Sequence, residues 1–201
     1  MLSGAGKRAA FAAFYGPLHY LIVRHIVCAL PGAVEEVSRI IDLGCGTGAA
    51  GAAWACSCPA RCSVIGIDRH PWAVAEASRT YGDFGLTGRA RRGDITRTHL
   101  PGKGAATICA FAMNELPDAE RDRLLGRLVE RARPGYRLLI VEPLAGFVAR
   151  WWGKWRVRFE GGGGRADEWR VELELPPIVA RLDRAAGLDH RELTARTLWL
   201  P

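Results

Sequence analysis

The sequence lacks a long uninterrupted apolar stretch. Its most apolar region, Phe11 to Leu30, is interrupted by Pro17, His19, Arg24 and His25, whereas a membrane-spanning helix needs about 20 consecutive apolar residues. No small-residue cleavage site follows a clean apolar segment, which argues against a secretory signal. We therefore predict a packed N-terminal helix, no membrane partner and cytoplasmic localisation.

Lysine is also scarce. Of the 28 basic residues, 25 are arginine, and the formal net charge is +7. Guanidinium groups bind phosphates and carboxylates in bidentate fashion, but a GC-rich genome also produces an arginine bias. Charge alone therefore leaves contact with nucleic acid open. With 201 residues, 49% of them hydrophobic, the chain is long enough for one well-buried domain.

The six cysteines form no small disulfide framework, which predicts reduced thiols. Cys56, Cys58 and Cys62 lie close together in "CSCPARC". Thiolates at short spacing can share a metal ion, but a metal site usually has four ligands, and no histidine or fourth cysteine stands nearby in sequence. We favour a helix end and turn with small buried thiols, and we predict no metal.

Strand and helix patterns alternate through most of the chain. Such alternation predicts an α/β fold with a doubly wound, mostly parallel, Rossmann-like sheet and helices on both faces. We expect strands within "SRIIDL", "CSVIGID", "GRARRGDIT", "ATICAFA", "YRLLIVEP" and "DHRELTARTLWL", and helices within "AAGAAWA", "PWAVAEASRTYG", "PDAERDRLLGRLVERARPG" and "PPIVARLDRAAGL".

The alternation of strand and helix patterns ends after Pro143. A segment rich in tryptophan and arginine follows, and it contains a run of four glycines, Gly161 to Gly164. It looks like an insertion in the alternating pattern. We interpret 1–201 as one domain, with an N-terminal helical cap at 1–37, a cofactor-binding core at 38–143, the insertion at 144–175, and a final helix and strand at 176–201.

A glycine-rich turn lies between the first predicted strand and its helix, in "IIDLGCGTGAAGAAWA". Glycine permits tight backbone angles and close approach of a ligand, and ligands of doubly wound sheets lie at the carboxyl ends of the strands. Gly46, Gly48 and Gly51 fit the dinucleotide pattern G-x-G-x-x-G, so an NAD-dependent oxidoreductase is one alternative. Asp42 argues against it, because a carboxylate crowds a pyrophosphate but can accept hydrogen bonds from a cationic, amino-acid-like ligand.

"IDLGCGTG" resembles the first motif of class I S-adenosylmethionine-dependent methyltransferases, and the later landmarks follow in the same order. The resemblance covers about Ser38 to Pro143 and the final helix and strand. It implies the class I methyltransferase fold, the cofactor S-adenosyl-L-methionine and the product S-adenosyl-L-homocysteine. It assigns Asp68 to the ribose hydroxyls and Asp94, with Ile95, to the adenine. The predicted cofactor-binding residues are Asp42, Gly44, Cys45, Gly46, Gly48, Asp68, Arg69, Asp94 and Ile95.

The residues after the fourth predicted strand, "FAMNELPDAE", face the methyl group in this fold. Methyl transfer is an in-line displacement, and its rate depends mainly on how the nucleophile is aligned with the methyl group. We predict that Glu115 takes a proton from the acceptor and that Asn114 holds it by hydrogen bonds. The alternative is that both residues cap the helix near Pro117.

"MNELPDAERDRLLGRLVERARPGYRLLIVEP" also resembles a narrower group, the methyltransferase-like proteins of small-ribosomal-subunit assembly. Membership would imply ribosomal RNA as the partner, with catalysis itself in question. Proteins of that group carry a cysteine cluster after the fifth strand, whereas this chain has tryptophans there.

The tryptophan-rich segment allows three interpretations. Its arginines and tryptophans can bind nucleic acid, its tryptophans can wall a small-molecule pocket, or the segment is a helix packed on the sheet. A small molecule with an oxygen or nitrogen nucleophile is favoured as the acceptor over RNA, because we find no separate RNA-binding domain. The predicted substrate residues are Tyr15, His19, Glu142, Trp151, Trp152 and Trp155.

Overall fold

The protein is described by a computed structural model over residues 4–100, 102, 104–132, 136–144 and 150–201. Its strands are β1 (Arg39–Leu43), β2 (Ser63–Asp68), β3 (Thr87–Arg92), β4 (Ala105–Ala110), β5 (Arg137–Glu142), β6 (Arg165–Glu172) and β7 (Glu192–Leu200). Its α-helices are α1 (Ala5–Ala10), α2 (Gly16–Ala29), α3 (Ala49–Ser57), α4 (Pro71–Asp83), α5 (Asp118–Arg131), α6 (Trp152–Gly161) and α7 (Pro177–Ala185). A π-helical segment, η1 (Phe11–Tyr15), joins α1 to α2, and the 3-10 turn η2 (Met113–Glu115) precedes α5.

The seven strands form one sheet in the order β3-β2-β1-β4-β5-β7-β6. Strands β1 to β5 pair in parallel, and β7 pairs antiparallel with both β5 and β6. The connections reverse direction at β1, whose Ile41 pairs with Ile65 of β2 on one side and with Thr107 of β4 on the other. A crevice outside the carboxyl ends of β1 and β4 is the expected ligand site of such a sheet. The predicted fold class is confirmed.

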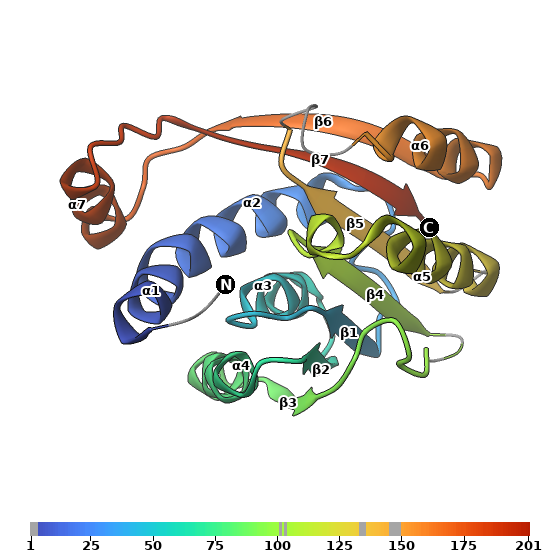
Figure 1. Ribbon diagram of the computed structural model, residues 1–201, viewed down its shortest axis with the longest axis horizontal. Helices are drawn as coiled ribbons and strands as arrows, with labels where there is room; N and C mark the ends of the chain where they lie inside the picture. The colour runs from blue at the N-terminus through green and yellow to red at the C-terminus, as the bar shows by residue number, and fades with distance from the viewer. Residues whose placement is uncertain (1–3, 101, 103, 133–135, 145–149) are drawn as a thin grey trace.

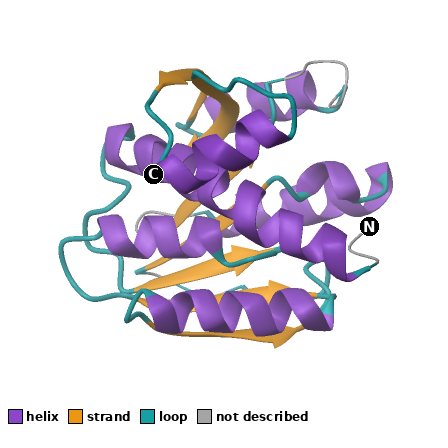
Figure 2. Cartoon of the chain, turned by 90° about the vertical axis from the view of Figure 1, so that its left-hand side faces the viewer, coloured by secondary structure: helices purple, strands orange, loops and turns teal. Residues whose placement is uncertain are grey.

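Helices cover both faces of the sheet, as Figure 1 and the turned view in Figure 2 show. One core cluster joins α2, α3 and α4 to the sheet around Trp54 and Tyr81, and the other joins α5 and α6 to it around Leu124 and Trp155. Burial on both faces explains why "RIIDL", "AATICA" and "RLLIVE" are almost continuously apolar.

The N-terminal helices α1, η1 and α2 form one continuous helical run. Pro17 lies in the first turn of α2 and has no backbone N–H to donate. The backbone widens just before it, where Gly16 N–H bonds to the carbonyl of Phe11, five residues earlier. The predicted helical cap therefore contains a π-bulge that places Phe11 and Tyr15 at a site described below.

The segment interpreted as an insertion belongs to the sheet. Its described part forms α6 and the edge strand β6, which pairs with β7 from Arg165↔Trp199 to Glu172↔Glu192. Residues 145–149 of this segment lie outside the described residues, as do Pro134 and Gly135, which were expected to close α5. Strand β6 escaped prediction because most of its residues are partly or fully exposed and polar, so no apolar alternation marks it.

None of the helices in the described part of the chain combines the length and apolar character needed to cross a bilayer.

Candidate functional site

A cavity of about 640 Å³ opens at the carboxyl ends of the parallel strands. Its walls come from the turns that follow β1, β2, β3 and β4, and from α1 and η1. Of the predicted cofactor residues, the cavity is lined by Gly44, Gly46, Asp68, Arg69 and Ile95. These residues are far apart in sequence, and the strand order brings them together.

The glycine turn after β1 forms the floor of this cavity. Gly44 and Gly48 have φ angles of 70° and 79°, which other residues rarely adopt. A Cβ on Gly44 would lie 2.6 Å from Cβ of Ala112, and one on Gly48 would lie 2.9 Å from Cα of Ala77. The protein's own packing therefore requires bare backbone at both positions.

The turn is bound to the end of β2. The backbone N–H groups of Gly44 and Cys45 donate to the carbonyl of Ile67 at 2.8 and 3.2 Å. Gly46 N–H donates to Oδ2 of Asp68 at 3.1 Å. These three N–H groups already have acceptors within the protein. A ligand would therefore contact the bare backbone surface of the turn more than its N–H groups.

Asp68 stands at the edge of the cavity with both carboxylate oxygens anchored. Oδ2 accepts from Gly46 N–H, and Oδ1 accepts from His70 N–H at 2.8 Å. Because each carboxylate oxygen has more than one acceptor site, Asp68 can still accept bonds from a ligand hydroxyl. Its fixed orientation suits the role predicted from sequence.

Asp42 has a different environment from the one expected. Its side chain is 1% exposed, and Oδ2 accepts from Gly51 N–H at 2.9 Å and from the Tyr81 hydroxyl at 3.3 Å. Burial raises the pKa of Asp42 to about 7, against the effect of these two hydrogen bonds. Asp42 lies inside β1 and faces α3, so the predicted direct contact with a ligand is replaced by a structural role.

Three other predicted cofactor residues also lie outside the lining of the cavity. Cys45 is buried, and burial raises the pKa of its thiol. Gly48 packs against α4. Asp94 is exposed and its Oδ1 accepts from both the backbone and the hydroxyl of Thr96, at 2.9 and 2.7 Å. Those bonds lower the pKa of Asp94 and shape the turn that presents Ile95 to the cavity.

The structure places the two predicted catalytic residues in different environments. Glu115 is exposed and lines the cavity. Asn114 is absent from the described lining because its side chain is occupied: Nδ2 donates to Oε2 of Glu142 at 2.5 Å, and Oδ1 accepts from Trp151 Nε1 at 2.9 Å. Neither residue caps α5, whose N-cap is Pro117.

Glu142 is fully buried at the end of β5 rather than open to an acceptor. Besides the bond from Asn114, its Oε1 accepts from Met113 N–H at 2.8 Å. Burial raises the pKa of Glu142 to about 7, and the hydrogen bonds and the nearby arginines Arg196 and Arg121 oppose that rise. Its role is to hold the loop that carries Glu115.

Aromatic side chains form part of the cavity wall. This aromatic wall consists of Phe11 and Tyr15 from η1 and Phe111 from the end of β4. Phe111 has a φ of 57°, and its ring stacks on His19 with centroids 4.1 Å apart. Burial lowers the pKa of His19 to about 4, so the imidazole is neutral at pH 7. His19 therefore packs against Phe111 and is not among the residues that line the cavity. Tyr15, also predicted to contact substrate, does line it.

The three tryptophans expected to contact substrate do not reach the described lining of the cavity. Trp151 bonds to Asn114. Trp155 is 1% exposed and donates to Oδ1 of Asp122 at 2.6 Å, while Trp152 lies under the guanidinium of Arg196 at 4.3 Å. These residues pack α6 onto the protein, which was the third interpretation of this segment.

The cavity is also lined by residues that sequence reasoning missed, namely Lys7, Ala10, Phe11, His70, Gly93, Phe111, Ala112 and Leu116. Phe111, Ala112 and Leu116 flank the predicted catalytic pair, so the position after β4 was a usable signal. Lys7 and Phe11 reach the site only because the N-terminal helices fold over the glycine turn, as the packing of Phe11 on Gly46 indicates. No local pattern reveals that contact.

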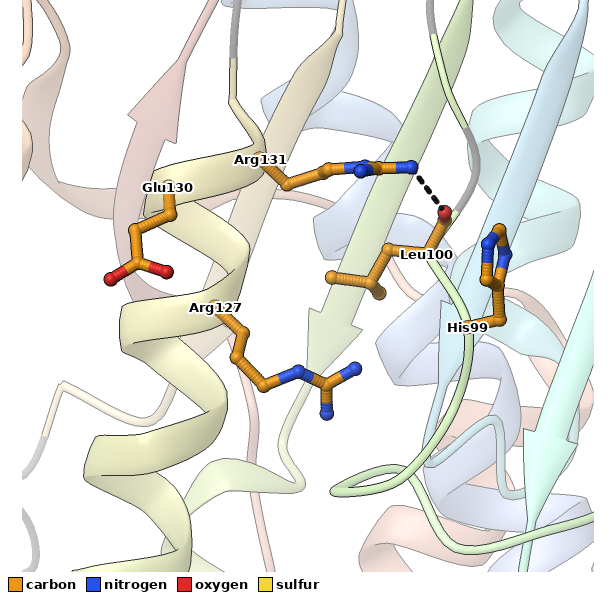
Figure 3. Close-up of a pocket in the computed structure, with 5 residues that line it drawn as sticks. All are labelled: His99, Leu100, Arg127, Glu130 and Arg131. Carbon is orange, nitrogen blue, oxygen red and sulfur yellow. Dashed lines mark hydrogen bonds between the residues drawn. The ribbon is translucent and has the colours of Figure 1, made fainter.

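A second cavity, of about 390 Å³, lies at the opposite edge of the sheet, before β4 and beside the end of α5 (Figure 3). Its arginines already bond to backbone carbonyls: Arg131 donates to Leu100 at 3.4 Å, and Arg127 donates to Thr98 at 2.7 Å. These arginines tie the loop before β4 to α5. The cavity at the carboxyl edge is therefore the better candidate for chemistry.

Comparisons with known proteins relate the chain to methyltransferases. Residues 40–135 match a family model described as a methyltransferase domain. No curated protein sequence matches the chain. Many solved structures share the fold.

Three of these structures illustrate the likeness. Mitomycin 7-O-methyltransferase is 16% identical with a TM-score of 0.59, over 91% of this chain and 54% of that one, so the chain spans about half of its length. A candidate RNA methyltransferase from Pyrococcus horikoshii is 14% identical with a TM-score of 0.57, over 92% of this chain and 81% of that one. Magnesium protoporphyrin IX methyltransferase from Synechocystis, solved with S-adenosylhomocysteine, is 18% identical with a TM-score of 0.56, over 90% of this chain and 82% of that one.

Proposed function

We propose that the chain is a class I S-adenosylmethionine-dependent methyltransferase and that it methylates an oxygen or nitrogen nucleophile of a small molecule. The observation that carries this proposal is the single cavity in which Asp68, Glu115 and an aromatic wall meet. The volume of about 640 Å³ lies within the range typical of small-molecule sites.

The charges around the cavity fit S-adenosylmethionine. Asp68 and Glu115 are acidic, whereas Lys7 and Arg69 are basic. This mixture suits a ligand that carries a sulfonium and an ammonium group together with a carboxylate. We assign Asp68 to the ribose hydroxyls and the loop at Gly93 and Ile95 to the adenine, because both lie on the β2 and β3 side of the cavity.

The acceptor binds, in this proposal, between the aromatic wall and Glu115. S-adenosylmethionine, when bound, supplies an electrophilic methyl group that a correctly aligned nucleophile attacks in line. Glu115 accepts the proton of an acceptor hydroxyl or amine at its carboxylate. Phe11, Tyr15 and Phe111 exclude water and favour a flat or apolar acceptor. Asn114 and Glu142 fix the loop that positions Glu115.

RNA is the second candidate acceptor, and one surface favours it. The exposed edge strand β3 carries Arg89, Arg91 and Arg92, and the next residue, Gly93, lines the cavity. Arginines along a strand can follow a phosphate backbone. RNA binding of this kind would weaken steeply with rising salt, whereas binding of an uncharged small molecule would not.

We place the protein in the cytoplasm because its six cysteines are free thiols, which are typical of a reducing compartment.

The test is methyl transfer from radiolabelled S-adenosylmethionine into a cell extract that is then separated into metabolite, RNA and protein fractions. The proposal predicts label in the metabolite fraction, and the matched Glu115→Gln variant should lose it. Label confined to RNA would favour the second candidate. Absence of label in every fraction, with S-adenosylhomocysteine binding intact, would contradict the proposed acceptor class.

A further inference from the structure

Two thiols meet at the turn between α3 and β2. Cys58 and Cys62 are separated by Pro59, Ala60 and Arg61. The Cys58 sulfur lies 3.4 Å from the carbonyl oxygen of Trp54, and the Cys62 sulfur lies 3.9 Å from the carbonyl oxygen of Ala55. Because these two carbonyls are consecutive in the last turn of α3, both sulfur atoms lie over the same helix end, where they contact each other.

The two thiols differ in acidity. The hydrogen bond from the Cys58 thiol lowers the pKa of Cys62, although burial opposes this effect. The same bond, together with burial, raises the pKa of Cys58. Arg137 and Cys28 are the other groups that act on Cys58, the first lowering and the second raising its pKa. Cys62 is therefore the more acidic of the two thiols, and the thiolate is the reactive form of cysteine.

The surroundings favour thiol chemistry over metal binding. In the described part of the chain, no three histidine, cysteine or acidic side chains lie close enough together to hold a metal ion. Cys58 is partly exposed and Cys62 is buried, so a small oxidant reaches the pair from the side of Cys58, and both thiols are free. A thiolate with a second thiol in contact is the arrangement of redox-active dithiols.

We propose that Cys58 and Cys62 form a redox-active dithiol that a hydroperoxide oxidises to a disulfide. The Cys62 thiolate attacks the outer peroxide oxygen, the O–O bond breaks, and the leaving alkoxide or hydroxide takes up a proton, leaving a sulfenic acid on Cys62. The Cys58 sulfur then attacks the Cys62 sulfur and loses its proton, and hydroxide leaves to form water. The two thiols are oxidised by two electrons and the peroxide is reduced to an alcohol, or to water when it is hydrogen peroxide, plus one further water.

The position of the pair links it to the cofactor site. Helix α3 begins at the glycine turn and ends at this pair, and β2 begins beside the pair and ends at Asp68. A disulfide would join the end of α3 to the start of β2, and the opposite ends of these two elements adjoin Gly48 and Asp68. The inference about oxidation stands independently of the proposed acceptor.

The sequence offers a sharp test, because Arg61 lies between the two cysteines. Trypsin cleavage at Arg39, Arg61 and Arg69 places Cys62 alone in peptide 62–69, and places Cys45, Cys56 and Cys58 in peptide 40–61. The full-length protein is treated with hydrogen peroxide, then denatured, blocked with an alkylating reagent and digested without reductant. We expect peptides 40–61 and 62–69 to be joined, and to separate when a reductant is added.

The variants identify the partner of Cys62. Cys58→Ser should lower the amount of the joined peptides at least about tenfold, whereas Cys56→Ser, a change on the same peptide at an exposed position, should leave it unchanged. Protein unfolded in urea before oxidation should lose this selectivity, because the folded turn brings the pair together. Persistence of the link in Cys58→Ser, or oxidation of Cys62 to a sulfinic acid with no link, would overturn the proposal.

Discussion

Asn114 donates its side-chain amide to the buried carboxyl group of Glu142 across 2.5 Å, so the loop after β4 is bound to the end of β5. Asn114 also accepts a hydrogen bond from Trp151, which ties α6 to the same point. Asn114 of "NELP" and Glu142 of "VEP" therefore contact each other, and neither is among the residues that line the cavity. Glu115, the next residue, is left to face the cavity.

Replacing Asn114 by alanine should destabilise the protein by about 1 to 3 kcal/mol, because the buried Glu142 and Trp151 side chains each lose a hydrogen-bond partner. Urea unfolding measures this change. The matched control is Glu115→Ala at the exposed neighbouring position, which should alter the free energy of unfolding by less than about 0.5 kcal/mol. Equal effects for the two variants would show that the Asn114 network does not hold the loop.

Replacing Asp68 by alanine should weaken binding of S-adenosylhomocysteine more than about tenfold, because a fixed carboxylate that bonds to the ribose hydroxyls is lost. Isothermal titration calorimetry measures the dissociation constant. Asp94→Ala is the control, since Asp94 lies outside the lining of the cavity and bonds to Thr96. A smaller loss for Asp68→Ala than for Asp94→Ala would reverse the assignment of the two acids.

Replacing Glu115 by glutamine should lower methyl transfer about 100-fold or more, the low end of the usual range for a general base. The dissociation constant for S-adenosylhomocysteine should stay within about twofold, because this substitution keeps the shape of the side chain. Single-turnover transfer of radiolabel and calorimetry separate the two effects. Full activity in Glu115→Gln would mean that the acceptor reacts without a base.

Asp42 and Glu142 should each lower the free energy of unfolding as the pH rises from about 4 to about 7, against the opposite contribution of His19, whose pKa burial lowers to about 4. Burial raises the pKa of Asp42 and of Glu142 to about 7, whereas both groups ionise near pH 4 in the unfolded chain. Between these values the two groups bind more protons in the folded state than in the unfolded state, so their contribution to the free energy of unfolding decreases with pH. Chemical denaturation at a series of pH values measures the slope.

Asp42→Asn should make this slope shallower. Asp94→Asn is the contrasting variant, because hydrogen bonds lower the pKa of Asp94 and its contribution to stability is lost as the pH falls. An unchanged slope in Asp42→Asn would show that Asp42 is ionised in the folded protein.

The parts of the site that the sequence predicts are those defined by local pattern. Gly44, Gly46 and Asp68 follow apolar strands directly, and a parallel sheet must bring the carboxyl ends of its strands to one edge. The resemblance to class I methyltransferases indicated Ile95, and the position after the fourth predicted strand indicated Glu115.

The remaining features depend on contacts between distant segments. Lys7 and Phe11 reach the cavity because the N-terminal helices fold across it, and Asn114 turns to Glu142 because that carboxyl group is buried nearby. Strand β6 is held by pairing with β7 and carries little apolar signal of its own. Tertiary structure decides each of these cases, so no window of sequence reveals them.

The most direct test of the central claim is a crystal structure of the protein grown with S-adenosylhomocysteine. The account predicts that the nucleoside lies in the cavity over Gly44 and Gly46, with its ribose hydroxyls bonded to Asp68. S-adenosylhomocysteine bound elsewhere, or a cavity that binds NAD in its place, would contradict it.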